Sequence, residues 1–236
     1  MSQYPYRDQQ PAWISASTAG SETQVRDFIR SVYAWMFGGL LVTAVAALWV
    51  VNSPALQQLI FGTPLRWVVF LAPIGLTLFL GFRITKMSAG AAAATFLVFS
   101  ALMGLSISSI FFVYTAAAIY QAFFTAAGMF GAMSVYGMVT KRDLTSWGSF
   151  FFMGLIGIII CSVINIWLKS PGLAWAVSFL GVFIFLGLTA YDTQKLKSYA
   201  TVPELRGNLA VYGALALYLD FINLFLMLLR LFGNRR

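Results

Sequence analysis

The sequence predicts an all-α polytopic membrane protein with seven transmembrane helices. Of its 236 residues 60% are hydrophobic and only 9% are charged, whereas a soluble domain carries about 25% charged residues. Seven apolar stretches are long enough to cross a hydrocarbon layer of about 30 Å at about 1.5 Å per helical residue. The alternating pattern of a membrane β-barrel is missing, so the backbone must satisfy its hydrogen bonds within helices.

The turn and charge signals between the apolar stretches set the expected span boundaries. We expect the spans at residues 30–51, 65–84, 89–114, 117–139, 147–168, 172–194 and 209–232. Turn-forming or charged residues separate most of them, as in the segments 52–54, 62–64, 140–143, 169–171 and 195–208. The weakest break covers residues 114–118, which include neither a charge nor a proline. Six helices with one very long or re-entrant segment are therefore the alternative.

The first part of the chain differs in composition from the rest. Residues 1–27 are rich in Gln, Ser, Thr and Pro, and their few apolar residues have no period. Such a segment buries too little surface to offset its ordering entropy. We therefore expect a disordered cytoplasmic tail over residues 1–27, followed by a transmembrane domain over residues 28–236. A secretory signal is not indicated, so the first span serves as the insertion signal.

Charge and cysteine content exclude several classes of function. The net charge of +8 comes from Lys and Arg residues scattered between apolar stretches, which fits lipid headgroups and predicts a lipid bilayer but no nucleic acid as partner. The chain has no histidine and the single cysteine Cys161, which argues against disulfide frameworks, zinc sites and histidine-based catalysis. We expect no cofactor and no enzymatic activity, since no Ser-His, Cys-His or metal-ligand set exists.

The distribution of basic residues predicts the orientation. In a seven-span arrangement the side of the N-terminus collects ten Lys and Arg residues against five on the other side. By the positive-inside rule this favours a cytoplasmic N-terminus and an external C-terminus. The basic end of the chain at residues 230–236 argues the other way.

Small residues predict where helices pack tightly. Gly128, Gly131 and Ser134 share a stripe in the fourth span, and Gly104 and Ser108 do so in the third. Stripes of this kind let helix backbones approach closely in lipid.

Two acidic residues lie deep in apolar sequence, Asp192 in the sixth span and Asp220 in the seventh. An ionised carboxylate in hydrocarbon costs several kcal/mol or more unless it is paired, hydrated or protonated, on the order of the transfer penalties of charged groups. An acid inside a span is therefore a functional-site hypothesis. The two spans run antiparallel and are joined by a short loop, so the carboxyl groups can meet across one interface.

The seventh span carries its polar residues on one face. Ala216, Asp220, Asn223, Met227 and Arg230 recur at helical spacing, while the other faces are Leu, Phe, Ile and Tyr. Two carboxyl groups in contact share a proton and titrate as a unit, which makes a proton sensor without histidine. The structural alternative is that each acid separately reaches a lysine, with Lys195 the candidate for Asp192.

Four segments of the chain resemble the Bax inhibitor-1 family, also called the transmembrane Bax inhibitor motif family, and in particular its bacterial inner-membrane branch. The similar segments are residues 129–137, 140–144, 187–195 and 217–233. The resemblance implies a fold in which the C-terminal helix is central and wrapped by the other six. It also implies a pH-sensitive cation (calcium) leak governed by an aspartyl pair, whose positions here are Asp192 and Asp220. Lys86 falls roughly where some members carry an arginine able to reach that pair.

Calcium chemistry is compatible with these residues. Ca²⁺ takes six to eight oxygen ligands, and Asp192, Asp220 and Asn223, together with Thr189 and Thr193, supply only a loose, hydrated set. A leak requires such looseness, because an ion bound too well does not leave.

The resemblance implies a second function as well: some bacterial relatives bind a membrane-bound ATP-dependent (AAA) protease, with the N-terminal tail as the contact.

Overall fold

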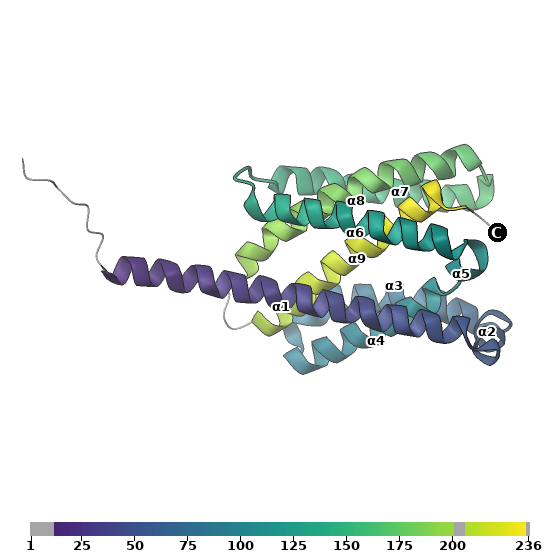
Figure 1. Cartoon of the computed structure of the whole chain (residues 1–236), viewed down its shortest axis with the longest axis horizontal. Helices are drawn as coiled ribbons and strands as arrows, with labels where there is room; N and C mark the ends of the chain where they lie inside the picture. Colours follow the sequence, from purple (N-terminus) through teal and green to yellow (C-terminus); the bar gives the residue numbers. More distant parts are fainter. Residues whose placement is uncertain (1–11, 201–205, 235–236) are drawn as a thin grey trace, which may run out of the picture.

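A computed structural model describes the backbone of residues 12–200 and 206–234 and the side chains of residues 22–200 and 207–234. Long helices lie side by side in a bundle, and the two ends of the described chain lie at opposite ends of it (Figure 1). The elements are α1 (Ala12–Val51), α2 (Pro54–Phe61), α3 (Leu65–Arg83), the 3₁₀ helix η1 (Ile84–Lys86), α4 (Ala89–Ile107), α5 (Ile110–Val113), α6 (Ala116–Val139), α7 (Thr145–Leu168), α8 (Pro171–Tyr199) and α9 (Arg206–Phe232).

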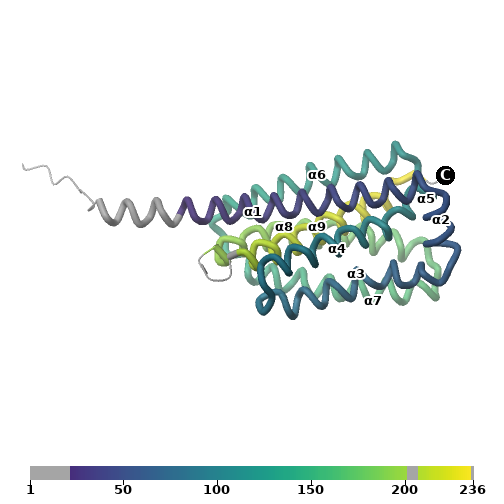
Figure 2. Tube along the Cα trace, turned by 90° about the horizontal axis from the view of Figure 1, so that it is seen from below, coloured from purple at the N-terminus to yellow at the C-terminus, as the bar shows by residue number. Residues whose placement is uncertain are grey.

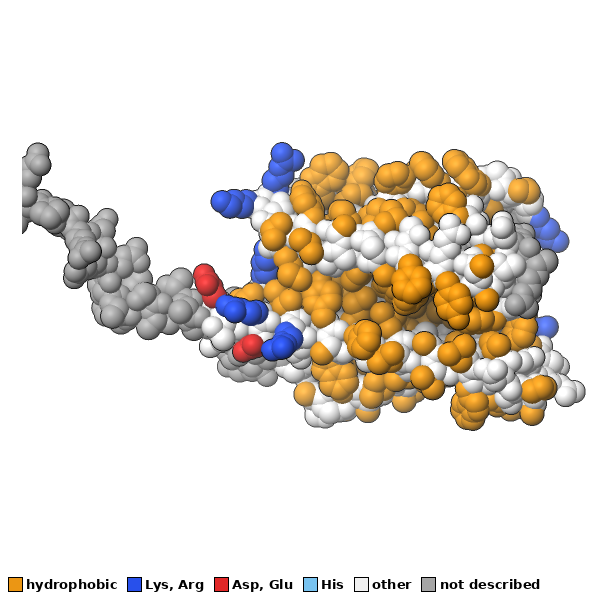
Figure 3. Space-filling model, in the orientation of Figure 1, with side chains coloured by type: hydrophobic (Ala, Val, Ile, Leu, Met, Phe, Trp, Pro, Cys, Tyr) orange, Lys and Arg blue, Asp and Glu red, His pale blue; other side chains and the backbone are white. Residues whose placement is uncertain are grey.

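The prediction of seven transmembrane helices is confirmed. Within the described residues seven helical segments are long and apolar enough to cross a membrane. Large apolar side chains cover the middle of the bundle, and Lys and Arg side chains lie at its two ends (Figure 3). An apolar belt with charged ends is what a bilayer requires.

The uncertain break at residues 114–118 is real, so the six-helix alternative is wrong. Tyr114 has an extended backbone, and Thr115 caps α6 by accepting a hydrogen bond from the backbone N–H of Ala118 at 3.3 Å. The N–H of Thr115 donates to the carbonyl oxygen of Asn234 at 3.2 Å, which ties this connection to the end of α9. The chain therefore reverses direction here without a charge or a proline, because a threonine cap and a backbone bond suffice.

Two helices extend beyond their expected bounds. The helix α8 continues to Tyr199 instead of ending at residue 194. Two lysines near its end have partners in the folded protein: Lys197 Nζ donates to the carbonyl oxygen of Met138, and Lys195 lies over two tyrosine rings. The polar residues that indicated a loop are thus part of a helix.

The helix α1 begins at Ala12, so residues 12–27 are helical where a disordered tail was expected. Extending an existing helix costs far less than starting one, so residues of poor amphipathic pattern can continue α1 upstream. Packing against the bundle begins with the partly buried Val25 and the buried Phe28. Residues 1–11 lie outside the described residues, and the division at residue 27 stays a prediction.

The most buried of the seven long helices is α9. It packs against α1, α4, α6 and α8, as its diagonal course through the bundle in Figures 1 and 2 illustrates. The expected wrapping by all six other spans is not confirmed, because α3 packs mainly on α4, and α7 packs mainly on α8. The helix α9 therefore has packed neighbours on most sides and a less covered side between α3 and α7.

A polar contact joins α9 to α1 in the core. The hydroxyl of Tyr218 lies 2.6 Å from Thr43 Oγ1, which also reaches the carbonyl oxygens of Gly39 and Ser100 at 2.9 Å. The Tyr218 ring is fully buried and meets Phe96 and Phe99 of α4 edge to face. The phenol is satisfied inside hydrocarbon, as a buried hydroxyl must be.

Polar side chains also fix the connections at the N-terminal end of the bundle. Gln194 of α8 accepts from the N–H of Leu144 at 2.9 Å and donates to the carbonyl oxygen of Arg142 at 2.8 Å, which clamps the loop between α6 and α7. In the same loop the Asp143 carboxylate accepts from the N–H and hydroxyl of Thr145, and these bonds lower its pKa below the ordinary value. Asn208 of α9 donates to the carbonyl oxygens of Ile84 and Met87 at 2.8 and 2.6 Å.

Only part of the predicted small-residue packing is present. A Cβ atom on Gly104 would collide with the backbone of Thr43, so this glycine does bring α4 against α1. Gly128 and Gly131 of α6 have no neighbour within 4 Å of such an atom. The close approach of α6 to α8 is instead made at Gly137, where a Cβ would meet the backbone of Ala190. A glycine stripe indicates a possible contact but not which glycine makes it.

We expect Gly137→Ala to destabilise the protein by about 1–3 kcal/mol, the usual cost of overpacking, because the new methyl group meets the carbonyl oxygen of Ala190 and lies 3.0 Å from Thr193 Cβ. Thermal unfolding in detergent measures the change. Gly131→Ala on the same helix is the matched control and should leave the melting temperature unchanged or slightly raised. Equal effects at the two positions would contradict the packing of α6 on α8.

The two faces of α9 should respond differently to substitution. Leu224 and Leu228 are buried in the core, whereas Asn223 is only partly buried. Leu224→Ala should cost about 2–5 kcal/mol, as for a core leucine. Asn223→Leu should stay within about 0.5 kcal/mol, because its amide only donates to the carbonyl oxygen of Leu219 on its own helix. Thermal unfolding of both variants decides this, and a large loss at Asn223 would show that the amide has a structural role.

Candidate functional site

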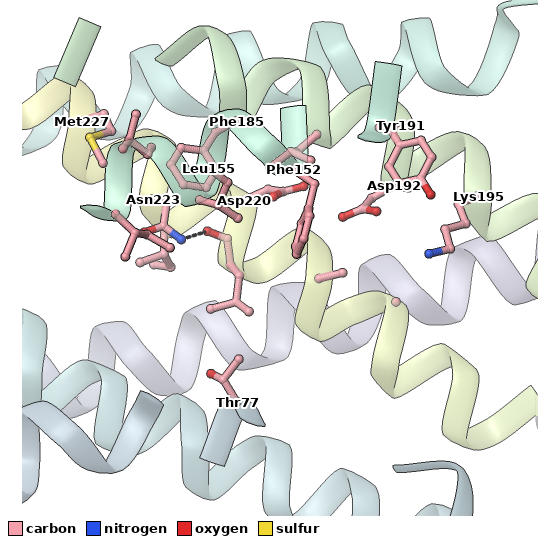
Figure 4. A pocket seen from close by; sticks show the side chains of 18 of the residues that line it. Thr77, Phe152, Leu155, Phe185, Tyr191, Asp192, Lys195, Asp220, Asn223 and Met227 are labelled. Carbon is pink, nitrogen blue, oxygen red and sulfur yellow. Dashed lines mark hydrogen bonds between the residues drawn. The ribbon is translucent and has the colours of Figure 1, made fainter. Parts of the chain in front are cut away.

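A cavity of about 1170 Å³ lies between α3, α7, α8 and α9, with a single contact from α4 at Met103. It occupies the less covered side of α9. Figure 4 shows Thr77 of α3 on one side of it, Phe152 and Leu155 of α7 on another, and the polar residues of α8 and α9 between them. Most of its lining is apolar, so the few charged side chains dominate its electrostatics.

The predicted polar face of α9 lines this cavity. All five residues of the expected stripe take part, namely Ala216, Asp220, Asn223, Met227 and Arg230. The helical spacing in the sequence therefore identified the face correctly, because a helix keeps residues three and four positions apart on one side.

The structure brings Asp192 and Asp220 together. Both line the cavity, and their carboxyl groups are close enough to interact directly across the interface of α8 and α9 (Figure 4). Asp220 is 4% exposed, and its Oδ2 atom has no hydrogen-bond partner among the described residues. A buried carboxyl oxygen without a hydrogen-bond partner destabilises the folded protein. A role in packing therefore does not explain why an acid occupies this position.

The sequence alternative, a separate lysine for each acid, does not describe this arrangement. Lys195 lies near Asp192 and attracts it electrostatically. Its ammonium group stands over the rings of Tyr191 and Tyr199, 5.5 and 5.7 Å from their centroids. Within the described part of the chain Asp220 has no basic partner, and its charged neighbour is Asp192.

Gly148 of α7 makes room for the Tyr191 ring, which lies under the ammonium group of Lys195. A Cβ atom at position 148 would come within 2.5 Å of the Tyr191 ring, so only glycine allows α7 to pack against the tyrosine that supports Lys195. Tyr191, Lys195 and Gly148 were not predicted as site residues. The signal available in the sequence was the position of Lys195, three residues after Asp192 and followed by Tyr199 at the next turn.

Asn223 lies on the same face as Asp220, one turn further along α9 (Figure 4). Its Nδ2 atom donates to the carbonyl oxygen of Leu219 at 2.8 Å. The amide nitrogen is thus used within the helix, which leaves the side-chain oxygen as the group of Asn223 that is available to a ligand. An oxygen of this kind suits a hard cation.

Three other expected residues lie elsewhere. Lys86 is exposed in η1 and does not line the cavity, so the structure does not bring it to the acids. Thr189 is buried and donates to the carbonyl oxygen of Phe185 at 2.7 Å. Thr193 is buried with its hydroxyl 3.4 Å from that of Tyr33. Thr193 therefore faces α1 and α6, whereas the hydroxyl of Thr189 is used within α8 itself.

The oxygen groups available to a cation are therefore the two carboxyls and the Asn223 amide. The described residues contain no group of three or more His, Cys, Asp or Glu side chains that could hold a metal ion. A binding site for a passing ion needs fewer ligands than a storage site, since water supplies the remainder.

Comparisons with known proteins identify the family to which the chain is similar. A family model described as "Inhibitor of apoptosis-promoting Bax1" matches residues 25–236. The chain is 49% identical to "Inner membrane protein YbhL" of Escherichia coli strain K12, over the whole length of both chains. It is 43% identical to an uncharacterized protein of Rickettsia prowazekii, covering 90% of this chain and 91% of that one. It is also 43% identical to an uncharacterized protein of Borreliella burgdorferi, covering 89% and 92%. The chain thus belongs to the Bax inhibitor-1 family of membrane proteins.

Proposed function

We propose that this protein is a pH-sensitive cation leak channel that passes calcium and is gated by protonation of Asp192 and Asp220. The observation that carries the proposal is the meeting of these two carboxyl groups inside a cavity between membrane-spanning helices. An acid pair at this depth has no structural need, because an apolar pair would pack at lower cost.

The chemistry of the pair couples protons to cations. When the pair holds a proton, the two carboxyl groups share it and present one negative charge to an ion instead of two. When the proton leaves, two carboxylates and the oxygen of Asn223 form an anionic site for a divalent cation. The same loss also removes the attraction that holds α8 to α9 at this point. Proton binding and cation binding thus compete at one place, and the cation enters as the substrate of transport. No cofactor and no enzymatic activity are part of this proposal.

The cellular location follows from the relatives and from the charge distribution. The relative from Escherichia coli is named an inner membrane protein, and we place this chain in the bacterial inner membrane, with lipid around the belt of Figure 3. The side of the N-terminus carries more Lys and Arg than the other side. By the positive-inside rule the N-terminus is cytoplasmic and the C-terminus is external.

We expect Asp192→Asn and Asp220→Asn each to abolish the pH dependence of calcium flux into liposomes that contain only this protein. Either change leaves one carboxyl group that cannot share a proton, so the coupled titration is lost. Asp27→Asn is the matched control, because Asp27 is an exposed acid of α1 outside the cavity. Wild-type pH profiles in both cavity variants would rule out gating by the pair.

A second candidate function is binding to a membrane-bound AAA protease. The observation that favours it is the N-terminal part of α1, which projects beyond the end of the bundle (Figure 1). A helix that extends from the bundle offers a surface to a partner on that side of the membrane. This function and the leak are compatible, since the cavity lies inside the bundle.

Deleting residues 1–21 should leave the fold and the calcium flux intact, because Val25 and Phe28, which pack against the apolar core, remain in the shortened chain. The same deletion should reduce co-purification of an AAA protease from solubilised membranes by about tenfold, the loss of 1.4 kcal/mol of binding free energy. Full-length protein with Asp220→Asn is the control for an effect of altered flux regulation alone. Undiminished co-purification of the truncated protein would contradict a contact through this helix.

A further inference from the structure

Arg230 lies where two cavities meet. A second cavity of about 450 Å³ is found at the C-terminal end of α9, between the ends of α7 and α8 and the connection at Tyr114. Arg230 and Ser162 line both this cavity and the larger one that contains the acid pair. The two cavities therefore follow one another along α9, with Arg230 at their junction.

Among the described residues no acid balances the charge of Arg230. The side chain is exposed, and within the described residues it has no ion-pair or hydrogen-bond partner. The described residues that line the second cavity include polar groups such as Asn165 and Ser178 but no carboxylate. The other basic residue of the larger cavity, Lys195, differs in this respect because it lies against two tyrosine rings and near Asp192.

Distance along the helix places Arg230 on the way out from the acid pair. It follows Asp220 by ten residues, or about 15 Å of helix at 1.5 Å per residue. A cation that leaves the pair through the second cavity passes this guanidinium group, because Arg230 lines both cavities. A fixed positive charge on the way of a cation is an electrostatic barrier.

We propose that Arg230 is the charge-selecting residue of the pathway, which slows divalent cations more than monovalent ones. This inference rests on the proposed function. The repulsion between Arg230 and an ion is proportional to the charge of the ion. The factor by which Arg230 slows a divalent cation is therefore the square of the factor for a monovalent one. The acid pair attracts calcium and Arg230 limits its exit, which together give a slow leak instead of an open pore.

A purely structural role for Arg230 makes a different prediction. A basic residue in the last turn of a helix stabilises the helix by its interaction with the helix dipole. If this were the only role of Arg230, its removal would change the melting temperature of the protein and leave the ratio of calcium to sodium flux unchanged. The flux ratio is thus the measurement that separates the two roles.

The experiment compares calcium and sodium flux into liposomes at one fixed pH for the wild type, Arg230→Gln, Arg230→Lys and Arg230→Glu. For Arg230→Gln we expect calcium flux to rise about tenfold and sodium flux about threefold, in line with the dependence on ionic charge. Arg230→Lys should keep the wild-type ratio, and Arg230→Glu should raise calcium flux further. Lys169→Asn is the matched control, a basic residue lost at the same end outside both cavities. Asn also suits the left-handed backbone of position 169, where φ is 48°.

A thiol-based version keeps the test independent of the folding of Arg230→Gln. Arg230→Cys in a Cys161→Ser background is compared before and after modification in the liposome. A trimethylammonium reagent should lower the ratio of calcium to sodium flux, and a sulfonate reagent should raise it. An unchanged ratio in folded Arg230→Gln, or equal ratios after both reagents, would overturn the role of Arg230 alone. Wild-type liposomes that pass neither cation at any pH would overturn the leak and this inference together.

Discussion

The arrangement of this protein depends on the burial of Asp220. A carboxyl group that is 4% exposed among leucines and phenylalanines destabilises the bundle unless something compensates for its lost hydration. The compensation within reach is a second carboxyl group, Asp192, together with the cavity that both residues line. Helix α9 can therefore be central on most of its surface but not on all of it, because the side that carries Asp220 has to border a cavity.

Helix α9 has two faces with opposite requirements: one face packs in the apolar core, and the other face borders the cavity. One face buries Leu217, Leu224, Leu228 and the Tyr218 phenol bound to Thr43, and it holds α1 and α4 in place. The other face borders the cavity, where α3 and α7 stand apart from it. The packed face fixes the position of α9 and thereby the position of its polar face. A packed face is needed in lipid because packing and hydrogen bonds, and not exclusion from water, hold the helices together.

Much of this fold could be predicted from the sequence because its signals are local. Seven spans, their breaks and the polar face of α9 follow from apolar length and helical spacing. The extension of α8 to Tyr199 could not be predicted, because Lys195 and Lys197 look like loop residues until Tyr191 and Met138 are found beside them. The same holds for glycines: Gly131 and Gly137 are alike in sequence, and only the partner helix distinguishes them. For the site, the two acids were predictable from their depth, whereas the exclusion of Lys86, Thr189 and Thr193 depends on helix rotations that no local pattern contains.

The clamp formed by Gln194 connects the acid pair to the membrane surface. Gln194 follows Asp192 by two residues, and its amide holds the backbone of Arg142 and Leu144 by two hydrogen bonds. A rotation of α8 that separated Asp192 from Asp220 would either break both bonds or carry the loop between α6 and α7 with it. The protonation state of a group inside the bilayer would then be visible at the surface as a change in the shape of a basic, water-exposed loop, where anionic lipids or a soluble protein could sense it.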